Sequence, residues 1–129
     1  MATLDTNLLL DYVLTDEKDL SIEFRQILTE QQFLIPTFVL LELGYVLLKV
    51  YRLPRSIVVS NLEALLRAPW LKTNRPLMQM TLAIFEAHPK LSLVDCCAMY
   101  FSRLNNSLPV YTRDKKMASQ SGGMARLVP

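Results

Sequence analysis

The chain has 129 residues and a mass of 14.8 kDa, which predicts a single domain over residues 1–129. Hydrophobic residues make up 51% of the sequence, and the mean hydropathy is +0.22. This composition excludes an intrinsically disordered chain, because disorder requires low hydrophobicity and a high net charge. The 14 basic and 12 acidic residues leave a net charge of +2, so any contact with nucleic acid must be local.

No segment is expected to cross a membrane. The most apolar stretch, 34–48, is interrupted by Glu42 and is shorter than the about 20 residues that a membrane helix needs. The first residues lack the basic start and apolar centre of a signal peptide. The adjacent Cys96 and Cys97 suit neither an ordinary disulfide framework nor a metal knuckle, and we interpret them as small buried apolar residues. We therefore expect a cytoplasmic protein.

Short apolar runs alternate with longer segments of helical periodicity along the chain. Strands are expected at 2–4, 33–35, 70–72, 109–112 and 125–128. Helices are expected at 7–14, from about 22, and at 37–51, 54–67, 76–87, 92–105 and 114–119, with a turn at Gly122 and Gly123. Asp16 and Asp19 are candidate caps of the second helix, and Thr37 of the third. Strands separated by helices predict an α/β fold, a three-layer helix–sheet–helix sandwich with a central, mainly parallel sheet.

Glu42 stands in a helix whose other residues are almost all apolar. A lone buried carboxylate costs several kcal/mol unless it is paired, protonated or bound to a cation, so this position predicts a functional group. The alternative is a narrow solvated stripe that Glu42 shares with Lys49, two helical turns further on.

Three aspartates stand near strand ends or helix starts. Asp5 and Asp114 each follow an expected strand and precede a helix, and Asp95 stands three residues after Ser92 in the spacing of a capping box. Helix capping alone would explain each of them separately. Because the carboxyl ends of parallel strands meet at one edge of a sheet, we expect these acids to converge with Glu42.

Clustered carboxylates repel one another unless a cation binds between them. Oxygen ligands of this kind suit Mg²⁺ or Mn²⁺. The sequence offers no cluster of His and Cys for zinc, and His88 beside a proline is expected to be a loop residue.

The segments that carry these acids are LDTNLLL at 4–10, LLEL at 40–43, VDCCA at 94–98 and VYTRDKK at 110–116. In this order, they resemble the motifs of the PIN-domain nucleases, specifically the VapC-like toxins of toxin–antitoxin pairs. Cys96 departs from the family pattern, which usually has alanine there.

The resemblance implies a metal-dependent endoribonuclease that hydrolyses RNA to 3′-hydroxyl and 5′-phosphate ends. It implies four catalytic, metal-binding carboxylates: Asp5, Glu42, Asp95 and Asp114. It also implies two supporting residues, Asn7 and Thr112. Three basic residues beside the last aspartate could hold the RNA backbone or form a solvated charge run: Arg113, Lys115 and Lys116. The implied partners are the RNA substrate, an antitoxin protein and a second copy in a homodimer.

Two other classes of protein fit these residues poorly. A haloacid-dehalogenase-like phosphatase needs a second carboxylate where Asn7 stands, and a phospho-receiver domain has no place for Glu42. A PIN nuclease with a role in RNA processing and a noncatalytic PIN interaction module remain alternatives to the toxin.

Overall fold

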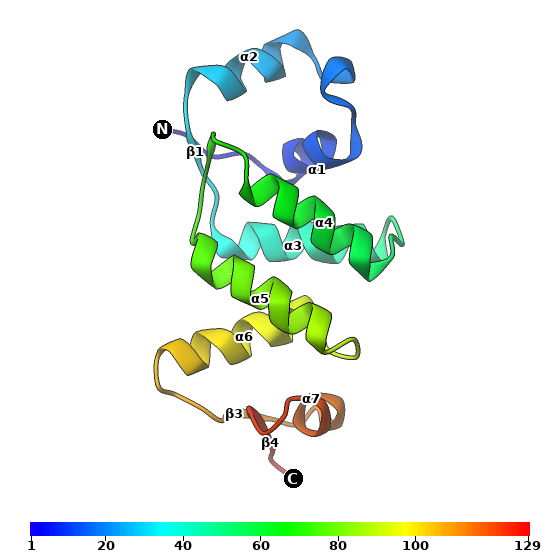
Figure 1. Cartoon of the computed structure of the whole chain (residues 1–129), viewed down its shortest axis with the longest axis vertical. Helices are drawn as coiled ribbons and strands as arrows, with labels where there is room; N and C mark the ends of the chain where they lie inside the picture. Colours follow the sequence, from blue (N-terminus) through cyan, green and yellow to red (C-terminus); the bar gives the residue numbers. More distant parts are fainter. The chain divides into compact units, whose positions relative to one another are not determined.

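The computed structural model describes residues Met1–Pro129 (Figure 1). The chain separates into two compact units, Met1–Arg75 and Pro76–Pro129. Helices alternate with short parallel strands in both, which confirms the α/β class with parallel strands. No helix has the length and apolar character needed to span a membrane.

The elements match most of the expected ranges. The first unit contains α1 (Thr6–Leu14), the 3₁₀ helix η1 (Glu17–Asp19), α2 (Ile22–Glu30), β1 (Phe33–Leu34), α3 (Thr37–Lys49), α4 (Arg55–Leu66) and β2 (Leu71–Lys72). Helix α5 (Arg75–Ala87) begins at the boundary, and α6 (Leu93–Leu104), β3 (Val110–Thr112), α7 (Lys115–Gln120) and β4 (Ala125–Leu127) follow it.

The sheet of the first unit is a parallel pair, β1 and β2, with Phe33 opposite Leu71. Ala2 extends this pair by a single parallel bridge to Phe33, and the carbonyl oxygen of Ala2 accepts a hydrogen bond from the amide of Leu34 at 2.8 Å. The strand expected at 2–4 is therefore reduced to one bridge. Its shortness follows from the early start of α1, because Asp5 already caps that helix.

The sheet of the second unit is a parallel pair, β3 and β4, in which Tyr111 lies opposite Arg126. Ser121 joins α7 to β4, since its buried hydroxyl donates to the carbonyl of Ala118 and accepts from the amide of Ala125. Gly122 and Gly123 adopt φ values of +63° and +92°, which confirms the expected turn. The strands expected of one central sheet are thus paired as two short sheets, one in each unit.

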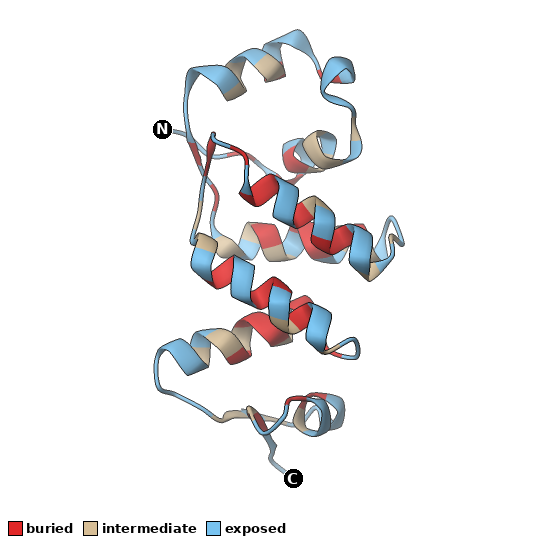
Figure 2. Ribbon diagram, viewed as in Figure 1, coloured by how far each residue is buried: buried red, intermediate tan, exposed pale blue.

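Buried leucines follow the helical period on α3 and α4 (Figure 2). Leu40, Leu43 and Leu47 line one face of α3, which packs against both α1 and α4. On α4 the buried Val58 and Leu62 alternate with exposed positions. This pattern is typical of amphipathic helices that bury one stripe, and it places α3 at the centre of the first unit.

Two helix starts differ from the expected ones. Helix α2 is capped by Ser21, whose hydroxyl oxygen accepts a hydrogen bond from the amide of Phe24 at 3.1 Å. The expected caps, Asp16 and Asp19, do not cap this helix. Asp16 instead precedes η1 and makes no capping bond with its side chain. Thr37 is the first residue of α3 rather than its cap, and the residue before it is a proline that has no side-chain acceptor.

Arg75 closes the segment that joins α4 to β2. Its Nε donates to the carbonyl of Leu66 at 2.7 Å, and its Nη2 donates to the carbonyls of Ala68 at 3.1 Å and Leu71 at 2.6 Å. A cation at the C-terminal end of a helix is favourable, because the last carbonyls lack partners within the helix. One guanidinium group therefore holds the end of the first unit together.

Cys96 and Cys97 are both buried, which confirms their interpretation as small residues of the apolar interior. Burial raises the pKa of the Cys97 thiol, and a weaker contact with the hydroxyl of Thr81 partly opposes this rise. The thiol therefore stays protonated at neutral pH and is a poor nucleophile.

Burial on α4 yields a prediction about stability. Replacing Leu62, which is 1% exposed, with alanine should lower the free energy of unfolding by about 2–5 kcal/mol, since a cavity remains in the core. Ile57→Ala on the same helix is the control, because Ile57 is 45% exposed and its loss should cost less than about 1 kcal/mol. Urea unfolding followed by circular dichroism measures both values. Equal losses would contradict the assignment of the buried face.

Candidate active site

Asp5 is the N-cap of α1. One oxygen of its carboxylate, Oδ1, accepts a hydrogen bond from the amide of Thr6 at 2.7 Å. The residue is exposed, and its other carboxylate oxygen has no hydrogen-bond partner in the protein. The capping expectation is therefore confirmed, and one oxygen remains available to a ligand.

Thr6 links the aspartate to the glutamate of α3. Its hydroxyl donates to Oε2 of Glu42 at 3.0 Å, and Thr6 is itself 8% exposed. The two residues stand 36 positions apart in the sequence, and the packing of α1 on α3 brings them together. The sequence pattern does not predict a role for Thr6. The only signal for it is a hydroxyl residue directly after the motif aspartate.

Glu42 is exposed, so the expectation of a buried carboxylate is wrong. Its neighbours on the same side of α3, Phe38 and Tyr45, are 69% and 59% exposed, and Lys49 is exposed as well. The physical reason is that several apolar side chains of α3 face solvent, so an apolar helix does not by itself bury Glu42. A burial penalty therefore does not argue for a cation at Glu42. The geometric feature that remains is the hydrogen bond from Thr6.

Asp95 lies in the first turn of α6, which Ser92 caps by accepting a hydrogen bond from the amide of Asp95 at 3.1 Å. The reciprocal bond of a capping box is not formed, and the carboxylate of Asp95 makes no hydrogen bond within the protein. The side chain is half-buried. Capping therefore accounts for Ser92 and leaves both oxygens of Asp95 unused.

Asp114 is the N-cap of α7. Its Oδ1 accepts hydrogen bonds from the amides of Lys116 at 2.9 Å and Met117 at 3.1 Å. Its own amide donates to the hydroxyl of Thr112 at 2.9 Å. Thr112 thus fixes the backbone of Asp114 rather than contacting a carboxylate, and the second oxygen of Asp114 has no partner in the protein.

The remaining site residues make fewer contacts. Arg113, Lys115 and Lys116 are exposed around Asp114 and form no ion pair. Asn7 is exposed on α1, and its side chain makes no hydrogen bond to Asp5 or Glu42. The roles expected for these four residues remain predictions.

The structure brings Asp5 and Glu42 together through Thr6 in the first unit, and it places Asp95 and Asp114 at helix starts in the second unit. No group of three or more His, Cys, Asp or Glu side chains is close enough to hold a metal ion. The convergence of all four acids remains a prediction. The candidate metal ligands are all carboxylate oxygens, with no nitrogen or sulfur ligand among them. Such a set of oxygen ligands suits Mg²⁺ or Mn²⁺.

The capping geometry of Asp114 can be tested without an activity assay. Asp114→Ala should destabilise the second unit by about 0.5–2 kcal/mol, because the amides of Lys116 and Met117 lose their acceptor. Asp114→Asn should lose much less, since asparagine is an equally good cap. Thermal unfolding in the presence of EDTA measures this difference. Equal losses in the two variants would show that the capping bond does not stabilise α7.

Among known protein families, the PIN domain matches residues 2–122. This match crosses the boundary between the two units and includes all four acids. No curated protein and no solved structure gives a significant match. The chain therefore belongs to the PIN domain family, whose members are typically metal-dependent nucleases.

Proposed function

We propose that the chain is an endoribonuclease that depends on Mg²⁺ or Mn²⁺ and uses Asp5, Glu42, Asp95 and Asp114 as its catalytic, metal-binding carboxylates. The observation that carries the proposal is the link from Thr6 to Glu42, which joins two motif acids from different helices and leaves each with one unused oxygen. Family membership supports the nuclease activity. We further propose that both units belong to one domain over residues 1–129, as the continuous family match favours.

The chain's own residues would act by holding carboxylate oxygens in place. The amide of Thr6 fixes one oxygen of Asp5, and the hydroxyl of Thr6 fixes one oxygen of Glu42. Two amides of α7 do the same for Asp114. Hydrogen bonds of this kind, from the protein to a metal-binding carboxylate, orient that carboxylate before the substrate binds. The divalent ion, when bound, supplies positive charge beside the scissile phosphate.

The proposed substrate is RNA, with water as the nucleophile and 3′-hydroxyl and 5′-phosphate ends as the products. Arg113, Lys115 and Lys116 favour contact with a phosphate backbone, because they are exposed, unpaired and adjacent to Asp114. Asn7 and Thr112 would support the site, Thr112 through its bond to the backbone of Asp114.

We also propose that the protein is the toxin of a toxin–antitoxin pair, forms a homodimer and is silenced by a cognate antitoxin. Exposed apolar side chains favour covering by another chain, and Phe38, Tyr45 and Ile57 are among them. An RNA-processing nuclease would use the same four acids without an antitoxin. A noncatalytic module would show no cleavage at all.

The link through Thr6 predicts the activity of two variants. Thr6→Val removes the hydroxyl at nearly constant volume and should lower the cleavage rate by about 10–100-fold, as loss of an outer contact does in metal sites. Thr6→Ser keeps a hydroxyl and should retain most of the activity. The assay follows cleavage of a labelled single-stranded RNA with Mg²⁺, with EDTA and with Asp5→Asn as inactive controls. Full activity of Asp5→Asn, or activity that survives chelation, would refute the proposal.

The proposed role of Glu42 in metal binding also predicts how Glu42→Gln changes the stability of the protein with and without Mg²⁺. Because the side chain is exposed, Glu42→Gln should change the unfolding free energy without metal by only about 0.5 kcal/mol. Addition of Mg²⁺ should raise the melting temperature of the wild type by mass action, and this shift should be markedly smaller in the variant. Differential scanning fluorimetry with Mg²⁺ and with EDTA measures the shift. Lys49→Gln, an exposed change on the same helix, is the control and should shift like the wild type.

If Glu42→Gln keeps both the Mg²⁺-induced shift and the cleavage activity, Glu42 is only a surface residue and the site contains three acids at most.

A further inference from the structure

The two units of the chain differ in charge. The first unit holds eight basic and nine acidic residues, whereas the second holds six basic and three acidic ones. The basic excess gathers toward the C-terminal end, because Asp114 is the only acid between residues 96 and 129. Five exposed basic residues surround it in this part of the sequence: Arg103, Arg113, Lys115, Lys116 and Arg126. A segment with this balance favours contact with a polyanion.

Arg126 of β4 lies directly opposite Tyr111 of β3. Residues that are opposite each other in a sheet project from the same face. The preceding pair, the half-buried Val110 and the buried Ala125, belongs to the other face. Tyr111 is 64% exposed, Arg126 is exposed as well, and neither side chain has a partner within the protein. An aromatic ring and a guanidinium group therefore stand next to each other on a face that is open to solvent.

This pair of side chains matches the two chemical parts of a single-stranded nucleic acid. Each base has a flat face that stacks on an aromatic ring, and this stacking tolerates any base. The guanidinium group of an arginine binds a phosphate through a planar fork of donors. In a duplex the bases already stack on one another, so their faces do not reach a protein surface. The combination of ring and cation thus favours an unpaired strand.

The pair also lies close to one of the proposed catalytic acids. Tyr111 precedes Asp114 by three residues, so their Cα atoms are at most about 11 Å apart. The hydroxyl of Thr112, which stands between them, accepts a hydrogen bond from the amide of Asp114 at 2.9 Å and fixes the chain there. A strand that passes Asp114 therefore has Tyr111 within reach of its neighbouring nucleotides.

We propose that Tyr111 and Arg126 form a binding subsite for single-stranded RNA, in which Tyr111 stacks on an unpaired base and Arg126 binds an adjacent phosphate. The subsite rests on the proposed nuclease function, because that function supplies RNA as the substrate. It adds a contact to the bases, which the basic residues around Asp114 do not provide. It also gives the chain a reason to act on unpaired rather than duplex RNA.

The experiment measures RNA binding by the full chain in EDTA, so that metal-dependent cleavage does not consume the probe. The probe is a labelled oligouridylate, and fluorescence anisotropy gives its dissociation constant. Two further probes are a strand of the same length and backbone without bases, and a duplex of oligouridylate with oligoadenylate. These probes separate contacts to a base from contacts to the backbone.

Tyr111→Ala should weaken the binding of oligouridylate about fivefold or more, which is the loss typical of one stacked base. Its binding of the strand without bases and of the duplex should not change. Tyr111→Phe keeps the ring and should bind like the wild type. Tyr51→Ala is the matched control, because Tyr51 is a tyrosine of the first unit that is 50% exposed. If Tyr111→Ala does not fold, Tyr111→Leu serves instead, since it keeps an apolar side chain without a ring.

Arg126→Gln should weaken the binding of oligouridylate and of the strand without bases alike. Loss of one phosphate contact should also reduce the slope of the logarithm of affinity against the logarithm of salt concentration by about 0.7. Lys90→Gln is the matched control, because Lys90 is an exposed cation of the same unit in the loop between α5 and α6. Its affinity and its salt slope should equal those of the wild type.

Three outcomes would overturn the subsite. The first is equal affinity of the wild type, Tyr111→Ala and Arg126→Gln for oligouridylate. The second is a loss in Tyr111→Ala that is the same with and without bases, because no base would then rest on the ring. The third is self-association of the chain that Tyr111→Ala abolishes, which would assign this face to a second copy.

The same variants separate the subsite from the nuclease function. If the chain cleaves RNA and both variants bind and cleave normally, the nuclease function stands and the subsite is refuted. If the chain binds RNA through Tyr111 and Arg126 but does not cleave it with Mg²⁺, the subsite stands and the nuclease function is refuted.

Discussion

The parallel bridge between Ala2 and Phe33 determines where the chemistry of the first unit lies. Parallel segments end at the same edge of a sheet, so the residues that follow them emerge side by side. Asp5 and α1 follow the first segment, and α3 with Glu42 follows the second. Once both helices start from this edge, a single hydroxyl group suffices to join the two acids.

The order and type of the elements could be predicted because local signals agreed with the final packing. The His88–Pro89 pair marks the end of α5, and Ser92 caps α6 as the sequence indicates. The α/β class with parallel strands follows from the alternation of short apolar runs with helical segments. These signals lie within a few residues of the feature that they predict.

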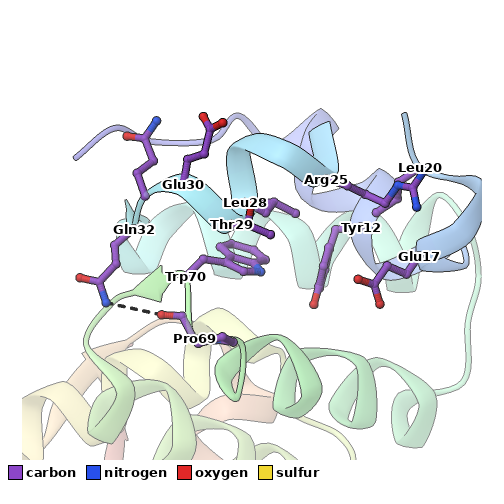
Figure 3. Close-up of a pocket in the computed structure, with 11 residues that line it drawn as sticks. Tyr12, Glu17, Leu20, Arg25, Leu28, Thr29, Glu30, Gln32, Pro69 and Trp70 are labelled. Carbon is purple, nitrogen blue, oxygen red and sulfur yellow. Dashed lines mark hydrogen bonds between the residues drawn. The ribbon is translucent and has the colours of Figure 1, made fainter. Parts of the chain in front are cut away.

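The environment of Glu42 could not be predicted, because it depends on residues that are far away in the sequence. A helix that is apolar on nearly all sides is expected to be buried on all sides, yet Phe38 and Tyr45 remain uncovered. Which apolar face stays exposed depends on contacts with distant parts of the chain. The same limit hid Thr6, whose partner lies on another helix. It also hid the cavity that Tyr12, Leu28 and Trp70 line, because these residues come from separate segments of the chain (Figure 3). The sequence identified the acids of the candidate site but not the groups that hold them.

Arg75 has a consequence for how this chain can vary. Its guanidinium group serves three carbonyls that point at it from different places, those of Leu66, Ala68 and Leu71. Lysine carries the same charge but concentrates it on one nitrogen, and it lacks the planar fork that reaches several acceptors at once. A change from arginine to lysine, harmless at most exposed positions, would here take away donors that the carbonyls of Leu66 and Leu71 receive from Arg75, whereas the carbonyl of Ala68 keeps its bond from the amide of Leu71. We therefore expect that Arg75 does not tolerate substitution even by lysine, the residue most similar to it in charge.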